Sequence, residues 1–243
     1  MITNANASAS AEVCRSFISS QLQGASQPGR FVDKNIRRAV TISRQAGCGA
    51  FVIAEKLAHY LQKHSSPDAC PWTVFDRNLI DKVLEDHNLP TRLAKFLPED
   101  RASEIEDILA DVFEMHPTSE TIIYQTAETI LKLAELGNAI LIGRGSTVIT
   151  AKLPHVFHVR LVAPLEKRIE HAYKFYHCYN KTEAEARKFC LNEDRGRERY
   201  LKKYFHTDIN DPLLYHMVIN TGLVGYDEAA KLIGDAVLNL NHD

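Results

Sequence analysis

The chain has 243 residues, of which 45% are hydrophobic and 25% charged, and its formal net charge at pH 7 is −2. This is the composition of a globular protein with a core, which excludes a disordered chain, a collagen and a disulfide scaffold. No apolar run approaches the roughly 18 residues that a membrane span needs, and the near-neutral charge gives no basic field that would attract nucleic acid.

The N-terminal segment, residues 1–37, is predicted to be an appendage that contributes little to the fold. It is rich in Ala, Ser, Asn and Gln up to Arg30. A weak helix over 8–23 is one interpretation and a flexible tail is the favoured one.

The start of the sequence lacks the basic and apolar blocks of a signal peptide, so we expect a cytoplasmic protein. The five cysteines show no CxxC spacing, which favours reduced thiols over disulfides or a zinc cluster.

From residue 38 onward, short β-branched runs alternate with segments of helical periodicity. Strands are predicted at residues 39–42, 72–75, 139–142, 156–162 and 217–220. Helices are predicted from the glycine turn to residue 61, and at 99–114, 122–133, 164–176, 182–203 and 226–238. Such alternation is typical of a parallel sheet with helices on both faces. Ligands of these sheets bind beyond the carboxyl ends of the strands.

The first predicted strand ends in a glycine turn, Gly47-Cys48-Gly49, and a helix follows. The N–H groups of such a turn and the positive end of the helix favour a phosphate. A complete P-loop continues with Lys and then Ser or Thr, whereas Ala50 and Phe51 occupy these positions here. By spacing alone, a phosphate loop and a tight structural turn are equally good interpretations.

Basic residues recur at the other strand ends and in one helix. Asp76-Arg77 follows the second strand, and Arg144 lies between two glycines after the third, so both are expected at the ligand crevice unless they form structural salt bridges. Arg195 and Arg199 are four residues apart, hence on one helical face, where an anion could lie between them. Taken as an isolated charge run, the segment favours the other interpretation, a solvated helix with Glu193 and Asp194 as partners.

Taken in order, these segments resemble the cytidylate-kinase-like proteins, a branch of the P-loop nucleoside monophosphate kinases. The resemblance covers about residues 38–238. It rests on the segments at residues 41–49, 74–80, 140–145, 163–169, 195–200 and 219–221, which read TISR with GCG, VFDRNLI, ILIGRG, APLEKRI, RGRERY and INT.

The resemblance implies an α/β, P-loop NTPase-type three-layer fold over residues 38–240, with a five-stranded parallel sheet, helices on both faces and a helical lid at about residues 181–210. It implies transfer of the γ-phosphoryl group of ATP to a nucleoside monophosphate such as CMP, with Mg²⁺ whose protein ligands are not identified. The implied partners are small nucleotides, with neither nucleic acid nor membrane. The implied roles are nucleotide binding by Arg44, Gly47, Cys48, Gly49 and Ala50, acceptor binding by Asp76, Arg77 and Arg144, and catalysis by Arg195 and Arg199.

The chain departs from the family pattern at the residues that hold charge. Ala50 and Phe51 replace the phosphate lysine and the magnesium hydroxyl, and Gly145 stands where cytidylate kinases carry Asp. Loss of one preorganised charge typically costs on the order of 10²- to 10³-fold in rate. A nucleotide-binding sensor or regulatory pseudokinase is therefore the alternative to an active kinase. Arg44 is the predicted substitute for the missing lysine.

Overall fold

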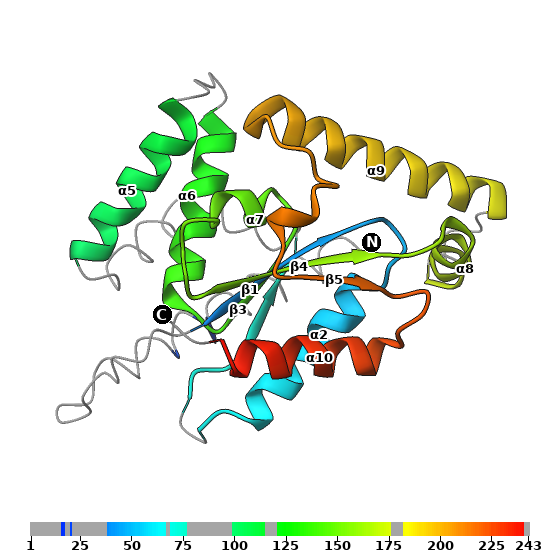
Figure 1. The fold of residues 1–243 in the computed structure, drawn as a ribbon, viewed down its shortest axis with the longest axis horizontal. Helices are drawn as coiled ribbons and strands as arrows, with labels where there is room; N and C mark the ends of the chain where they lie inside the picture. The colour runs from blue at the N-terminus through cyan, green and yellow to red at the C-terminus, as the bar shows by residue number, and fades with distance from the viewer. Residues whose placement is uncertain are drawn as a thin grey trace.

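The computed structural model describes residues 16–17, 20, 38–66, 69–76, 99–114, 121–175 and 182–240. Its centre is a five-stranded sheet in the order β2-β3-β1-β4-β5 (Figure 1). The strands are β1 (Ala39–Arg44), β2 (Thr73–Phe75), β3 (Ala139–Ile142), β4 (Val156–Val162) and β5 (Met217–Asn220). Every pairing is parallel. The predicted α/β fold with a five-stranded parallel sheet is confirmed.

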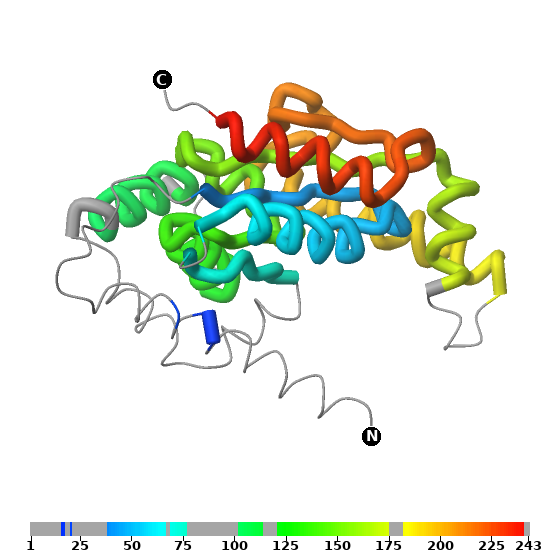
Figure 2. The backbone as a smooth tube through the Cα atoms, turned by 90° about the horizontal axis from the view of Figure 1, so that it is seen from below, coloured from blue at the N-terminus to red at the C-terminus, as the bar shows by residue number. Residues whose placement is uncertain are grey.

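Helices cover both faces of this sheet. They are α2 (Ala50–Lys63), α5 (Glu99–Glu114), α6 (Thr121–Leu136), α7 (Ser146–Ile149), α8 (Leu165–Phe175), α9 (Glu183–Phe205) and α10 (Tyr226–Leu238), with a short 3₁₀ helix at Pro212–Leu214. α2 and α10 run side by side on one face (Figure 2). α5, α6 and α7 lie on the other face, and the long helix α9 spans the molecule on that side (Figure 1). No helix within the described residues is long and apolar enough to cross a membrane.

Each face of the sheet has its own apolar core, because successive strand residues point to opposite faces. On β1, Ala39 packs in the core beneath α5 and α6, whereas Val40 and Ile42 pack in the core beneath α2 and α10. Leu201 and Phe205 anchor the end of α9 in the first of these cores. The start of α9 is fixed by a capping box between Thr182 and Glu185, as the sequence spacing predicted.

Two expectations change at the periphery of the fold. Phe17 is 1% exposed and packs edge-to-face on Phe75, with 5.2 Å between the centroids of the two rings. The N-terminal segment therefore contributes to the core at this residue. The remainder of residues 1–37, apart from residues 16 and 20, lies outside the described residues. In α6, Ile122 is 68% exposed and Ile123 is buried instead. The other residues predicted to line this helix, Thr126, Ile130 and Leu133, are buried, so the prediction is wrong only at its first residue.

Three of the cysteines can be placed. Cys48, Cys70 and Cys190 are buried free thiols. Cys14 and Cys178 lie outside the described residues.

Candidate functional site

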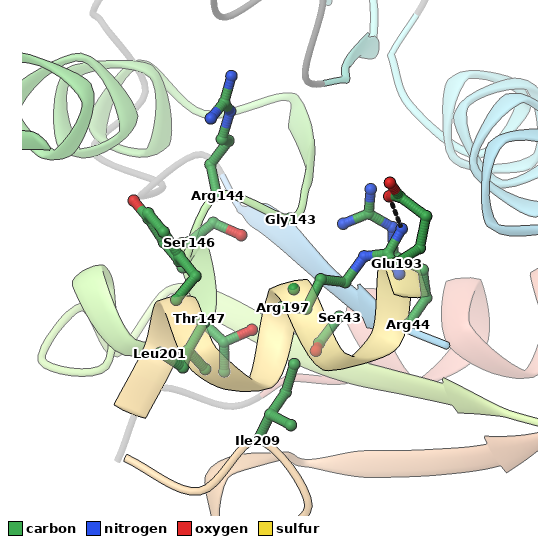
Figure 3. A pocket seen from close by; sticks show the side chains of 13 residues that line it. Ser43, Arg44, Gly143, Arg144, Ser146, Thr147, Glu193, Arg197, Leu201 and Ile209 are labelled. Carbon is green, nitrogen blue, oxygen red and sulfur yellow. Dashed lines mark hydrogen bonds and ion pairs between the residues drawn. The ribbon is translucent and has the colours of Figure 1, made fainter. Parts of the chain in front are cut away.

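Two adjoining cavities open where β1 ends beneath α9. Each measures about 280 Å³, and Arg44, Arg197 and Ile209 line both. The first cavity combines the hydroxyls of Ser43, Ser146 and Thr147 with the side chains of Tyr200 and Leu201, and its charged residues are Arg44, Arg144, Glu193 and Arg197 (Figure 3). The second cavity is far more basic, with guanidinium groups from Arg44, Arg160, Arg168, Arg195 and Arg197. The site is thus divided into a hydroxyl-rich chamber and an arginine-rich chamber.

A polar stripe on β1 and β4 forms the floor of this site. Thr41 pairs in register with His158, and Ser43 with Arg160. Their side chains bond across the strands, at 2.8 Å from Thr41 Oγ1 to His158 Nδ1 and at 2.9 Å from Arg160 Nη1 to Ser43 Oγ. Thr147 Oγ1 lies 3.1 Å from Thr41 Oγ1 and ties the stripe to α7. The apolar residues between them face α2 and α10, so strand alternation directs this polar set toward α9.

Arg160 is the most deeply buried cation of the site, with 4% of its surface exposed. Besides Ser43, it donates through Nη2 to Asn210 Oδ1 at 3.2 Å. It forms no ion pair with a carboxylate of the described residues. Burial lowers the pKa of Arg160 because desolvation disfavours the charged form. An arginine nevertheless remains protonated in proteins, so the cavity contains a charge that no ion pair in this part of the chain compensates.

The glycine turn is packed between two helices. Gly47 and Gly49 have φ angles of +83° and +73°, which suit glycine. A Cβ on Gly47 would collide with the carbonyl oxygen of Arg168 in α8, and one on Gly49 with the Tyr226 ring in α10. Burial raises the pKa of the Cys48 thiol to about 11, so this side chain is a neutral core group.

A carboxylate of α9 binds the same turn. Asp194 Oδ1 accepts the N–H of Ala46 at 2.7 Å, and Asp194 Oδ2 accepts from Arg168 Nη1 at 2.6 Å. Arg168 also donates to the carbonyl oxygens of Ala46 and Ala163. Arg197 Nη1 reaches Asp194 at 3.2 Å and its Nη2 reaches Glu193 at 3.0 Å. Asp194 thus connects α9 to the glycine turn and to α8.

The turn after β3 has an unusual backbone. Gly143, Arg144 and Gly145 have φ angles of +79°, +58° and +76° in succession. This conformation is costly for a side chain such as Arg144, and such strain recurs at functional sites. A Cβ on Gly143 would collide with the Arg44 guanidinium, which lies against the turn. Figure 3 shows Arg144 directed away from Arg44 and Arg197.

The predicted site residues are only partly brought together. Arg44, Arg144 and Arg195 line the cavities. The glycine turn and the start of α2 lie beside the cavities, but their predicted residues line neither cavity: Gly47, Cys48, Gly49 and Ala50. Asp76 and Arg199, which belong to other parts of the chain, also line neither cavity. Arg77 lies outside the described residues.

Sequence reasoning missed Arg160, Ser146 and Arg197. Arg160 had a readable signal, since a charged residue in an otherwise apolar strand is rarely buried without a purpose. Arg197 was hidden because the basic run of α9 offers several faces. Ser146 gave no signal, although it is 1% exposed and its Oγ has no hydrogen-bond partner in the described part of the chain.

Protein ligands for magnesium are not evident at the two cavities. Glu193 and Asp194 are bonded to arginines. No group of three or more His, Cys, Asp or Glu suited to a metal ion occurs among the described residues. A metal here would depend on oxygens of a bound substrate and on water, which is a common arrangement for Mg²⁺.

Comparison with models of known protein families shows which family the chain belongs to. The model of the cytidylate kinase-like family matches residues 39–223, which is more than half of the chain. The chain belongs to the cytidylate kinase-like family. The match includes the glycine turn, the turn after β3 and the basic part of α9, and the family supports a nucleotide-kinase-like function.

Two further likenesses are more limited. A stretch of 94 residues is 30% identical to the uronate isomerase of Corynebacterium glutamicum, covering 39% of this chain and 18% of that enzyme. The match thus spans less than a fifth of this curated relative. The crystal structure of an uncharacterized protein from Eubacterium ventriosum superposes with a TM-score of 0.54 at 18% identity, over 83% of this chain and 98% of that chain. This second likeness shows the fold alone.

Proposed function

We propose that the protein is a nucleotide kinase that transfers the γ-phosphoryl group of ATP to a nucleoside monophosphate such as CMP. The observation that carries the proposal is the pair of adjoining cavities at the end of β1, one hydroxyl-rich and one arginine-rich, sharing Arg44 and Arg197. Phosphoryl transfer asks a protein mainly for in-line positioning and for positive charge on the moving group. Two chambers with cations at their boundary suit this task.

In this proposal the arginine-rich cavity and the glycine turn hold the phosphates of the donor. The first cavity holds the acceptor, whose polar groups can bond to Ser43, Ser146 and Thr147. Arg197 borders both chambers, and its pairs with Glu193 and Asp194 fix its orientation before a ligand binds. A preorganised guanidinium at this boundary stabilises the charge of the transferring group. α9 covers the site and keeps water from competing with the acceptor.

Magnesium is expected to enter bound to the triphosphate, where it would neutralise charge on the phosphate oxygens. The described residues offer no carboxylate set for it. The work assigned to this chain is therefore done by arginines and backbone N–H groups.

A nucleotide-binding sensor is the second candidate. Two observations favour it: Ala50 occupies the lysine position, and the Asp194 carboxylate already binds the N–H of Ala46 in the turn. A sensor would bind ATP without turnover.

The two candidates are separated by measuring turnover and binding on the same preparation. A coupled assay of ADP formation is run with CMP, dCMP, UMP, AMP and GMP, and ATP is titrated by calorimetry. Turnover with one of the monophosphates supports the kinase. ATP binding without turnover selects the sensor, and the absence of both contradicts both proposals.

A further inference from the structure

The arginine-rich cavity carries more positive charge than its own carboxylates balance. Five guanidinium groups line it, from Arg44, Arg160, Arg168, Arg195 and Arg197, against the carboxylates of Asp194 and Glu198. Arg168 and Arg197 share Asp194, and Arg197 is also paired with Glu193 outside this cavity. Neither Arg160 nor Arg195 forms an ion pair within the described part of the chain.

Among the five arginines of this cavity, Arg160 is the one that a bound anion would stabilise most. Its surface is 4% exposed, so water solvates it poorly. A guanidinium has five N–H donors. Nη1 of Arg160 donates to Ser43 Oγ and Nη2 donates to Asn210 Oδ1, both neutral acceptors. The charge of Asp194 raises the pKa of Arg160, but Asp194 is bonded to Arg168 and Arg197 and forms no ion pair with Arg160. A buried charge without a paired opposite charge is unfavourable, and binding of a counter-ion there is favoured.

We propose that this cavity is a phosphate site and that Arg160 is its innermost ligand. The unused N–H donors of Arg160 would bind phosphate oxygens, and Arg195 would approach from α9. The planar guanidinium suits paired contacts to phosphate. The bearer of the phosphate is taken from the proposed function, namely the polyphosphate chain of a nucleotide. The site itself depends only on the charge and burial described here.

This assignment accounts for the absence of the P-loop lysine. Ala50 provides no cation at the position of the P-loop lysine. Arg160 enters instead from β4, the neighbouring strand, and Ser43 on β1 fixes its guanidinium at 2.9 Å. The compensating charge would thus come from a different strand, in addition to Arg44.

The test uses tripolyphosphate, which has the charge of the nucleotide tail but neither base nor sugar. Its affinity is measured by calorimetry for the full chain, for Arg160→Met and for Arg160→Lys. Arg187→Met, on the exposed side of α9, is the matched control because it removes the same charge away from the cavity. Arg160→Met is expected to weaken binding at least about 10-fold, through loss of charge-assisted hydrogen bonds. Arg160→Lys should lie between it and the wild type, and Arg187→Met should match the wild type.

Thermal unfolding separates a binding role from a structural one. If Arg160 is there for the ligand, Arg160→Met melts at the wild-type temperature or above it without ligand, because an uncompensated buried charge has been removed. Its stabilisation by tripolyphosphate is then lost. A lower melting temperature with undiminished stabilisation by tripolyphosphate would show that Arg160 is structural and would overturn the proposal.

Two remaining outcomes also decide. If Arg160→Met does not fold, Arg160→Lys carries the test, and wild-type tripolyphosphate affinity in that variant overturns the proposal. If tripolyphosphate binds through Arg160 but no monophosphate is phosphorylated, the phosphate site stands and the kinase proposal fails.

Discussion

At the residue scale, the important distinction is between neighbouring arginines of α9. Arg197 borders both cavities, whereas Arg199 lines neither and its Nε donates to the carbonyl oxygen of Arg195. Two residues along a helix are separated by about 200° around its axis, so the side chains of Arg197 and Arg199 leave α9 in different directions. Arg195 shares the face of Arg199 but lines the arginine-rich cavity, so the difference at Arg199 is its exposed position outside both cavities. The sequence pairs Arg195 with Arg199, but the geometry of the site favours Arg197.

Arg197→Ala is therefore expected to lower kcat/KM by about 10²- to 10³-fold, since it removes a preorganised charge from the boundary of the two chambers. Arg199→Ala, which removes the same charge from an exposed position that lines neither cavity, should change kcat/KM little. Steady-state kinetics with the best monophosphate measure both. A larger loss for Arg199→Ala than for Arg197→Ala would contradict this prediction and support the catalytic role that the family resemblance implies for Arg199.

The sequence could not reveal which residues of different strands contact one another. Ser43 and Arg160 are far apart in sequence and meet only because β1 and β4 are neighbours in this register. Their alternation with apolar residues was readable in each strand, yet its meaning depends on which strand lies beside which. Arg44 at the end of β1 was readable, because a glycine turn marks where that strand reaches the crevice.

At the scale of elements, the strands were predicted to within about two residues because each is an apolar run bounded by turn residues. The buried faces of the helices were harder to predict than the strands. Ile122 and Ile123 in α6 are both apolar, so periodicity alone could not show which one is buried. The start of α9 followed from its capping box, but the side that it presents to the site depends on Leu201 and Phe205, which anchor its end in the core.

The link between α9 and the glycine turn gives a prediction at this scale. Asp194→Asn preserves the shape of the side chain but removes the charge that Arg168 and Arg197 share. We expect the free energy of unfolding, measured in urea, to fall by about 1–3 kcal/mol. Tripolyphosphate affinity should rise several-fold, because a competing anion has left the cavity. Glu228→Gln, at an exposed position of α10, controls for the change in net charge.

A fall in tripolyphosphate affinity for Asp194→Asn would contradict this prediction. It would mean that Asp194 holds the guanidinium groups in place for the ligand and does not compete with it.

At the scale of the whole molecule, the three-layer arrangement determines what each face of the sheet can do. The face beneath α2 and α10 is apolar at β1 and β4, whereas the opposite face carries Thr41, Ser43, His158 and Arg160 between an apolar core and the cavities. The molecule thus places polar groups inside the fold on the side that α9 covers. Their burial makes overall stability depend on pH.

His158 makes this dependence testable. Burial, with a smaller effect of His216, lowers the pKa of His158 from 6.5 to about 3, and burial also lowers the pKa of His216. Between these pH values the unfolded chain binds a proton at His158 that the folded chain does not, so stability rises with pH and is lost as pH falls from about 6.5 toward 3. For His158 alone, the free energy of unfolding should fall by about 2 kcal/mol between about pH 7.5 and about pH 5. Urea unfolding at both pH values measures this difference in the free energy of unfolding.

His158→Gln should reduce this difference, whereas His59→Gln, at an exposed position of α2, should retain it. An equal difference in His158→Gln and the wild type would show that other groups cause the acid sensitivity.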